Sequence, residues 1–376
     1  MTIVFFARSV RFDTDGMSVD HSPQQAKISP PNNTHQTGQT TGFYLLFAAT
    51  TTILIAALAV SLATGPRNSI MGSTHSSKLK AAKEVNAAAG SLSGRVALVF
   101  GGTSGIGQAL AQRLAVGGAS VTIVGRNDHA GQETVLAMRA VNPAGNHTYV
   151  KCDAMLLSNV RLMTQQFVAT ASRLDYVVFC QTKATMQGYT PTAEGIDEKL
   201  ALNYYSRVFA TEMLLPLLKR TASQFGADVR VLSVLSAGVH KPYEGYAADP
   251  SLKDTYSLSN AANAAGFYTD LWVDKASQLN PDVTFVHATP GFVANRETDM
   301  SAPVRCAIRL MQATPSDCAE MLLQGLVGRP LKGGFRLLGE YGTEDNAPKT
   351  SLHTADAVDV VHRHTRTTID PFLTPS

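Results

Sequence analysis

The sequence predicts an α/β fold, a doubly wound parallel sheet in a single domain over residues 92–345. Two observations carry this prediction. Short apolar segments rich in β-branched residues recur along this part of the chain, which is typical of strands buried on both faces. Segments with helical spacing separate them, and strands alternating with helices favour right-handed crossovers and a parallel sheet.

The first expected strand, 95–101, ends in glycine and leads into a helix over 105–115. The other expected strands are 120–125, 147–152, 175–180, 229–235, 284–288 and 335–338. The other expected helices are 129–140, 156–171, 194–220, 256–279 and 303–326. No internal repeat interrupts the alternation, so we expect one domain rather than two.

Composition excludes some classes of function. The chain is 44% apolar and 16% charged, and its net charge of +3 is small and dispersed. We therefore expect no binding of nucleic acid. The four cysteines show no CxxC or Cys/His ligand spacing, which predicts reduced thiols and no metal site. They are Cys152, Cys180, Cys306 and Cys318.

Outside the domain we expect four segments. Residues 1–41 are polar and without periodicity, which predicts a disordered tail. Residues 42–64 carry no charge and at about 1.5 Å per residue can span a ~30 Å hydrocarbon core, which predicts a transmembrane helix. Residues 65–91 are expected to form a linker, and 346–376 a C-terminal extension.

Basic residues are denser after 42–64 than before it, which predicts a single-pass protein whose catalytic domain faces the cytosol, at the endoplasmic reticulum. A second interpretation is that translation starts at Met71. The protein would then be soluble in the cytosol.

A cluster of small residues joins the first strand to the first helix. Small residues let the backbone approach a diphosphate, and the helix N-terminus offers free N–H groups to the anion. This placement predicts a dinucleotide site. Its expected cofactor-binding residues are Gly101, Thr103, Ser104, Gly105, Ile106 and Gly107.

The second strand ends at Gly125 and is followed by Arg126, with no acidic residue at its tip. An arginine there favours the 2′-phosphate of NADP over the free ribose of NAD, so we expect NADP(H). The alternative is an ordinary surface arginine. Asp153, after the third strand, is placed to contact the adenine or to cap the next helix.

The glycine loop resembles the TGxxxGIG loop of the short-chain dehydrogenase/reductase family, and five further segments resemble that family's motifs in the same order. These segments are 151–153, the asparagine helix around Asn203, the strand 231–236, the YxxSKxA-like run 256–262, and the HPGxV-like turn 287–293 with Pro290, Gly291 and Val293. The resemblance covers about residues 92–345 and implies a Rossmann-type fold. Within this family, the sequence is similar to a divergent fungal branch that is linked to secondary metabolism.

The resemblance also implies roles for residues. In the family a tyrosine exchanges a proton with the substrate oxygen, a serine binds that oxygen, a lysine lowers the tyrosine pKa, and an asparagine fixes a water. Carried over, these positions are Tyr256, Ser236, Asn260 in place of the lysine, and Asn203. Cofactor contacts are implied for Pro290, Gly291 and Val293. A homodimer or homotetramer is also implied.

The chain departs from the family pattern at several points. Asn260 carries no charge, so it cannot supply the electrostatic effect of the lysine. The turn 179–182 lacks the family's glycine and asparagines, and a loop is inserted between Ser236 and Tyr256. Ser233 is therefore an alternative for the active hydroxyl. Three lysines are candidates to replace the missing one, although a solvated surface position is the ordinary expectation for each. They are Lys183, Lys241 and Lys253.

Two functions follow from this pattern. The first is an NADP(H)-dependent oxidoreductase that interconverts a carbonyl and a secondary alcohol on a small, lipophilic substrate. The second is a catalytically impaired dinucleotide-binding protein that acts as a scaffold or partner. The stretches 240–252 and 292–308 are the expected substrate-facing segments.

Overall fold

The computed structural model describes residues 66–291, 293, 313–328, 333–344 and 352–373, with side chains from 75 onward. The expected tail, 1–41, and the expected membrane helix, 42–64, lie outside these residues. Within the described part of the chain, no helix is both long and apolar enough to cross a membrane.

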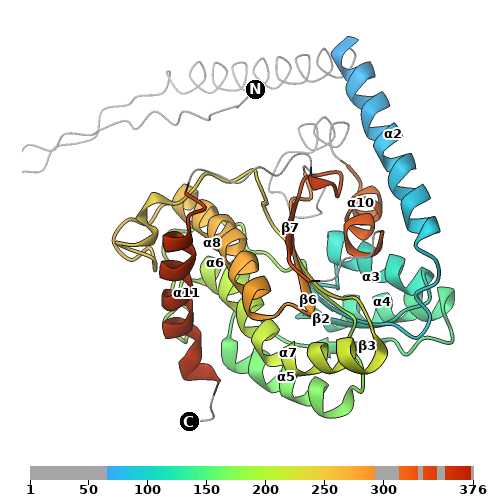
Figure 1. Ribbon diagram of the computed structural model, residues 1–376, viewed down its shortest axis with the longest axis horizontal. Coiled ribbons are helices and arrows are strands. Elements are labelled where there is room, and N and C mark those ends of the chain that lie inside the picture. The colour runs from blue at the N-terminus through green and yellow to red at the C-terminus, as the bar shows by residue number, and fades with distance from the viewer. Residues whose placement is uncertain (1–65, 292, 294–312, 329–332, 345–351, 374–376) are drawn as a thin grey trace, which may run out of the picture. The chain divides into compact units, whose positions relative to one another are not determined.

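Seven parallel strands form one sheet in the order β3-β2-β1-β4-β5-β6-β7 (Figure 1). The strands are β1 (Val96–Phe100), β2 (Ser120–Gly125), β3 (Thr148–Lys151), β4 (Tyr176–Phe179), β5 (Val229–Val234), β6 (Val283–Ala288) and β7 (Phe335–Leu338). The predicted α/β fold with one parallel sheet is confirmed, and each strand lies within one residue of its predicted ends. The direction in which successive strands are added to the sheet reverses between β1 and β4. Open α/β sheets bind ligands at such a switch point.

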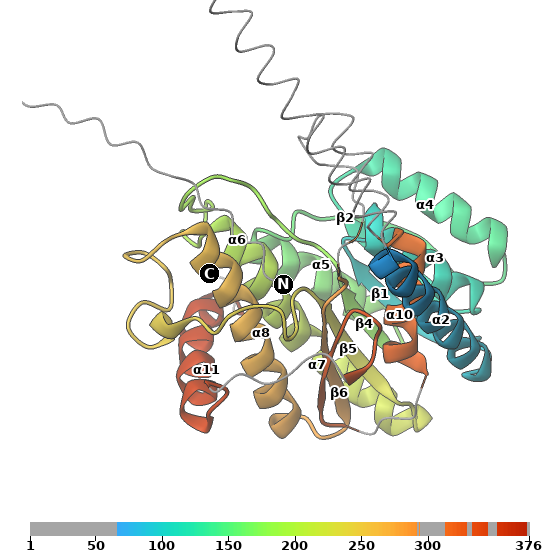
Figure 2. The ribbon, with the colours of Figure 1, turned by 90° about the horizontal axis from the view of Figure 1, so that it is seen from above.

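Helices cover both faces of the sheet, with α3, α4 and α10 on one side and α5, α7 and α8 on the other (Figure 2). Their bounds are α2 (Pro66–Ala88), α3 (Gly105–Val116), α4 (Asp128–Val141), α5 (Leu157–Thr170), α6 (Glu198–Leu200), α7 (Ser206–Phe225), α8 (Leu258–Leu279), α10 (Pro315–Val327) and α11 (Ala355–Ile369). A π-helical turn, Ala201–Tyr205, joins α6 to α7. The predicted helix 194–220 is thus interrupted near its start.

Alternate residues of β1 belong to two different cores. Leu98 and Phe100 pack with α5, α7 and α8, whereas Ala97 and Val99 pack with α3 and α10. Successive side chains of a strand point to opposite faces, so a strand buried on both faces has no polar positions. This explains why the apolar segments in the sequence are continuous rather than alternating.

The segment predicted as a linker, 65–91, is helical over most of its length. Its alanine-, lysine- and glutamate-rich second half favours a helix. Near the end of α2, the Asn86 amide donates to the Glu320 carbonyl oxygen at 2.9 Å and to its carboxylate at 2.8 Å. These bonds dock α2 on α10.

The segment beyond the expected domain, 346–376, contributes to the core. Its helix α11 packs on α8, with Val361 and Ile369 at most 1% exposed. The Thr365 hydroxyl lies 2.7 Å from the Tyr204 hydroxyl in the π-helical turn. The C-terminal segment is therefore an integral part of the α8 side of the fold.

We predict that Ile369→Ala lowers the free energy of unfolding by about 2–5 kcal/mol, because it leaves a cavity in the core. Leu279→Ala is the matched control, since Leu279 is 55% exposed at the end of α8 and should change stability by at most about 0.5 kcal/mol. Urea denaturation measures both. Equal, small effects would show that α11 does not belong to the folded unit.

Candidate functional site

The loop between β1 and α3 is packed too closely for side chains. Gly101 has φ +73°, and a Cβ there would lie 2.5 Å from the Gln181 backbone nitrogen after β4. A Cβ on Gly107 would lie 2.2 Å from the Gly101 carbonyl oxygen. Only glycine fits at both positions, and the contact brings the start of α3 directly onto the carboxyl ends of β1 and β4.

The N-terminus of α3 is open to an anion. Ser104 is the N-cap residue, but its side chain makes no capping hydrogen bond, and the first turn holds no acidic residue. The first N–H groups of a helix lack intrahelical partners and lie at the positive end of its dipole. A diphosphate would satisfy both features, so Thr103 to Gly107 fit the predicted nucleotide cradle.

Arg126 follows the carboxyl end of β2 and is exposed, and no contact of its side chain with another described residue is seen. The nearest acid, Asp128, binds Lys151 at 2.5 Å and the Tyr149 hydroxyl at 3.1 Å. Gly125 is close to the cradle, because a Cβ there would lie 2.6 Å from the Thr103 side chain. Arg126 therefore stands beside the cradle and is available to an anionic ligand.

The remaining expected cofactor residues lie on the same edge. The Asp153 carboxylate accepts from the Met155 N–H at 3.1 Å and does not cap α5. That role belongs to Glu194, whose carboxylate accepts from the Leu157 N–H at 2.6 Å and the Ser158 N–H at 2.9 Å. The alternative of Asp153 as a helix cap is therefore wrong.

Beyond β6, Pro290 and Gly291 are described, and Gly291 has φ +67°. Val293 forms an isolated parallel bridge with Ala313. Phe292 and most of the expected substrate-facing stretch 292–308 lie outside the described residues.

Ser233 and Ser236 occupy different surroundings. Ser233 is fully buried, and its hydroxyl accepts from the Arg207 guanidinium at 2.7 Å. Arg207 is also fully buried, and it donates to the Val234 and Gln181 carbonyl oxygens. The Ser236 hydroxyl is buried and has no hydrogen-bond partner. Ser233 therefore supports Arg207, which leaves Ser236 as the hydroxyl available to a ligand.

Arg207 holds together the carboxyl ends of β4 and β5. Its guanidinium spans the Gln181 carbonyl after β4 and the Val234 carbonyl at the end of β5. Burial lowers the pKa of Arg207 to about 10. The sequence analysis did not single out this residue, because a charged side chain in a predicted helix is ordinarily solvated.

Asn203 lies in the π-helical turn and fixes the segment after β4. Its amide oxygen accepts from the Lys183 N–H at 2.8 Å, and its amide nitrogen donates to the Lys183 carbonyl at 3.0 Å. The extra backbone residue of a π-turn re-aims a side chain and is frequent at functional sites. Asn203 is thus a positioning residue for 181–183.

A buried lysine lies beside Tyr256. Lys199 on α6 is 5% exposed, and its Nζ lies 5.7 Å from the centre of the Tyr256 ring. Its Nζ also donates to the Gln187 carbonyl at 2.8 Å and lies 3.7 Å from the Glu198 carboxylate. The Asn260 side-chain amide donates instead to the Thr255 backbone carbonyl at 2.7 Å. The cation near the tyrosine therefore comes from a different element than the family pattern implies.

The three lysines proposed as replacements are placed elsewhere. Lys183 forms an ion pair with Glu198 at 2.5 Å, while Lys241 and Lys253 are exposed. Lys199 was missed, although it lies four residues before Asn203 on the predicted helix and thus on the same helix face. That spacing was the available signal.

Among the described residues, the Tyr256 hydroxyl is buried without a hydrogen-bond partner, like that of Ser236. The two hydroxyls do not bond to each other. Ser236 lies against Gly266, where a Cβ would be 2.3 Å from its Oγ, whereas Tyr256 precedes the start of α8 and packs edge-on against Tyr189. Buried polar groups are rarely left without partners, so each hydroxyl is suited to bind a ligand.

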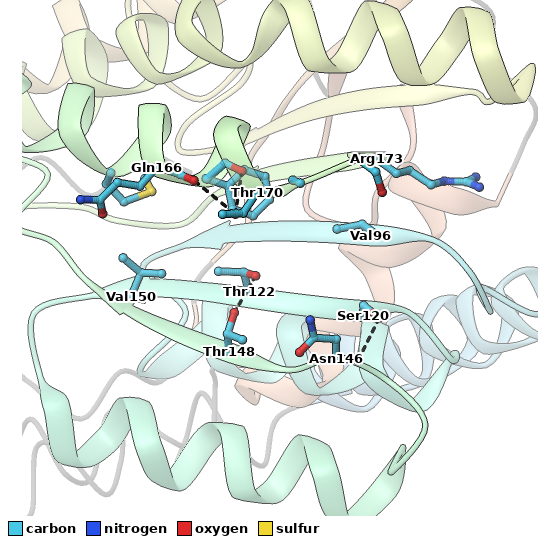
Figure 3. A pocket seen from close by; sticks show the side chains of 13 residues that line it. Val96, Ser120, Thr122, Asn146, Thr148, Val150, Gln166, Thr170 and Arg173 are labelled. Atoms are coloured by element: carbon cyan, nitrogen blue, oxygen red, sulfur yellow. Dashed lines mark hydrogen bonds between the residues drawn. The ribbon is translucent and has the colours of Figure 1, made fainter.

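A hollow of about 550 Å³ lies between the sheet and α5 (Figure 3). It is lined by the starts of the strands, with Val96, Ser120 and Thr148, and by Arg173 after α5. The glycine loop lies at the opposite ends of the same strands. This hollow is therefore not the nucleotide site.

A parallel sheet with an uncapped glycine cradle at its topological switch point is the geometry with which Rossmann-type domains bind dinucleotides. The family model for short chain dehydrogenase matches residues 95–305. The chain belongs to the short-chain dehydrogenase family.

Curated relatives agree with this membership. An oxidoreductase of Emericella nidulans is 33% identical over 227 residues, which cover 60% of this chain and 66% of that protein. Human polyprenol dehydrogenase is 32% identical over 206 residues, which cover 50% of this chain and 62% of that protein. The chain thus spans slightly less than two thirds of the length of these relatives.

Among solved structures, an uncharacterized protein from Mycobacterium Paratuberculosis superposes with a TM-score of 0.55 at 19% identity, covering 75% of this chain and 95% of that chain. A likeness at this identity concerns the fold alone.

We predict that Gly107→Ala weakens NADPH binding at least 10-fold, because the new Cβ would displace the Gly101 carbonyl and widen the cradle. Gly188→Ala is the matched control, since Gly188 is exposed and a Cβ there meets nothing within 4 Å. Fluorescence titration measures affinity, and circular dichroism checks the fold. Unchanged affinity in a folded Gly107→Ala variant would remove the cradle from the site.

Proposed function

We propose that this chain is an NADP(H)-dependent oxidoreductase that interconverts a carbonyl and a secondary alcohol on a small, lipophilic substrate. The uncapped cradle at the start of α3 is the single observation that carries the proposal. It offers unpaired backbone N–H groups and the positive end of the α3 dipole to a diphosphate. It lies at the carboxyl edge of the sheet, as does Ser236, one of the two hydroxyls without a partner among the described residues.

Arg126 supports NADP(H) rather than NAD(H). It stands next to Gly125, whose Cα lies against Thr103 in the cradle, and it is exposed. A guanidinium binds a phosphate through charge-assisted, often bidentate hydrogen bonds. Asp128 would disfavour an anion here, but Lys151 compensates its charge.

Tyr256 is the proposed proton donor to the substrate oxygen in the direction of reduction. A reduced nicotinamide, when bound, would supply the hydride for the carbonyl carbon. The Tyr256 phenol would donate the proton to the oxygen, and the positive charge of Lys199 would stabilise the phenolate that remains. Ser236 is the proposed second hydroxyl on the substrate oxygen.

A lipophilic substrate is supported by one similarity and one expectation. The human relative is named a polyprenol dehydrogenase. The uncharged segment 42–64 is expected to hold the domain at the cytosolic face of the endoplasmic reticulum membrane. Such an anchor places the site beside substrates dissolved in the bilayer. A role in fungal secondary metabolism and a homodimer or homotetramer remain predictions.

The alternative function, nucleotide binding without hydride transfer, rests on Asn260 and on the altered turn 179–182. The buried Lys199 weakens that argument, because it supplies a cation beside the tyrosine from another helix. We therefore favour the enzyme.

We predict that Arg126→Ala weakens NADPH binding about 10- to 150-fold, the equivalent of losing charge-assisted hydrogen bonds. Binding of NADH should not change. Arg363→Ala, on the exposed face of α11, is the control. Calorimetry with both nucleotides gives the comparison, and an equal loss for NADPH and NADH would refute 2′-phosphate recognition.

We predict that Tyr256→Phe reduces NADPH-dependent turnover at least ~100-fold, because the proton donor is lost, while NADPH affinity stays within about 2-fold. The assay follows NADPH oxidation against a panel of lipophilic aldehydes and ketones. Wild-type turnover in the variant would exclude Tyr256 from the chemistry.

We predict that Lys199→Met lowers kcat about 10-fold or more while NADPH affinity stays within about 2-fold, because the phenolate loses its neighbouring cation. Lys241→Met, at an exposed position, is the control. Steady-state rates and calorimetry with NADPH test this. An equal loss of kcat and of NADPH affinity would make Lys199 a structural residue only.

A further inference from the structure

A carboxylate is buried in the middle of α8 among three imidazoles. The Asp270 side chain has no exposed surface. Its Oδ1 lies 2.5 Å from His287 Nδ1, and its Oδ2 lies 3.0 Å from His353 Nε2 and 3.2 Å from His240 Nε2. The imidazoles come from β6, from the segment before α11 and from the loop after β5. The proposed function uses none of these four side chains.

The hydrogen bonds of two imidazoles determine where their protons lie. The Ser236 N–H donates to His287 Nε2 at 3.1 Å, so Nδ1 carries the proton that is donated to Asp270. His240 Nδ1 lies 2.7 Å from the Ser236 carbonyl, which can only accept, so this Nδ1 also carries a proton. A neutral His240 therefore directs the lone pair of Nε2 toward the carboxylate.

Three imidazoles surround this buried carboxylate on both of its oxygens. Across the described residues, the ion partners of Asp270 are histidines and include no lysine or arginine. Buried carboxylates are ordinarily paired with a cation or a metal.

A cation for this carboxylate could be a proton on His240, a proton on His353, whose Nε2 is at hydrogen-bond distance from Oδ2, or a metal ion shared by both rings. The geometry at His240 favours the metal. His240 Nε2 lies 3.2 Å from Asp270 Oδ2, yet it makes no hydrogen bond, although the side chain is only 2% exposed. An N–H that neutralised the carboxylate would point at the oxygen. A tetrahedral zinc ion holds its nitrogen and oxygen ligands at about 2.0–2.1 Å, so neighbouring ligand atoms lie about 3.3 Å apart. Asp270 Oδ2 lies at a similar distance from His240 Nε2, 3.2 Å, and from His353 Nε2, 3.0 Å.

The outer contacts are also those of a metal site. Metal-binding histidines ordinarily donate their other ring N–H to a carbonyl or carboxylate, which fixes the ring. His240 does so to the Ser236 carbonyl, and the second oxygen of Asp270 is fixed by His287. The three ligand atoms, on His240, Asp270 and His353, all lie within 4.8 Å of one another.

We propose that His240, Asp270 and His353 bind one divalent transition metal ion, zinc by their nitrogen and oxygen ligands, with water as a fourth ligand. The ion joins the segment before α11 to α8 and to the loop that holds Ser236. The ligands lie on three segments far apart in the chain and form no short motif, so the sequence pattern predicted no metal site.

The test uses the full-length chain, stripped with a chelator, dialysed and titrated with zinc. We expect about one zinc ion per chain by mass spectrometry, and a rise in Tm of roughly 5–10 °C at zinc 100-fold above Kd. Cobalt(II) in place of zinc should give the intense visible absorption of a four-coordinate ion. Absence of bound zinc with an unchanged Tm would overturn the proposal and leave a proton as the counterion.

His353→Gln should weaken zinc binding at least about 10-fold, while His362→Gln, in the middle of α11, should leave it unchanged. Equal zinc binding by both variants would place the ion elsewhere and refute this site. If His353→Gln does not fold, the zinc content and cobalt spectrum of the unaltered chain still decide, because an octahedral cobalt spectrum or no bound metal contradicts the proposed ligands.

Discussion

The contact between Gly107 and the Gly101 carbonyl is the constraint on which the site depends. A Cβ at Gly107 would lie 2.2 Å from that oxygen, so α3 can start against β1 only because both residues lack side chains. This contact leaves the first N–H groups of α3 at the carboxyl edge of the sheet, where the strand order switches between the adjacent strands β1 and β4. One packing restriction thus fixes both the entry angle of the helix and the electrostatics of the cradle.

Polar groups on one helical face organise the neighbouring strand ends. Lys199, Asn203 and Arg207 follow one another at intervals of four residues, through α6, the π-turn and α7. Arg207 joins the ends of β4 and β5, Asn203 fixes the backbone of Lys183, and Lys199 faces Tyr256. Burying charge is costly unless it is compensated, and here hydroxyl and carbonyl oxygens bind Arg207 while Glu198 lies 3.7 Å from Lys199. The regular spacing places all three side chains against the carboxyl ends of the strands.

The sequence predicted the sheet well because strands buried on both faces produce continuous apolar segments, and β2 and β7 were predicted to the residue. It predicted the glycine cradle because that motif is local. It did not predict Lys199 or Arg207, whose functional placement depends on burial by elements distant in the chain. The helices α2 and α11 were missed for a similar reason, because their stability comes from docking on α10 and α8.

The central claim is that the chain binds a nicotinamide dinucleotide at the start of α3. Isothermal titration of the full-length protein with NADPH and with NADH tests it most directly. We expect one NADPH per chain, bound at least about 10-fold more tightly than NADH. Failure to bind either nucleotide, in a protein whose circular dichroism shows the folded α/β domain, would contradict the claim.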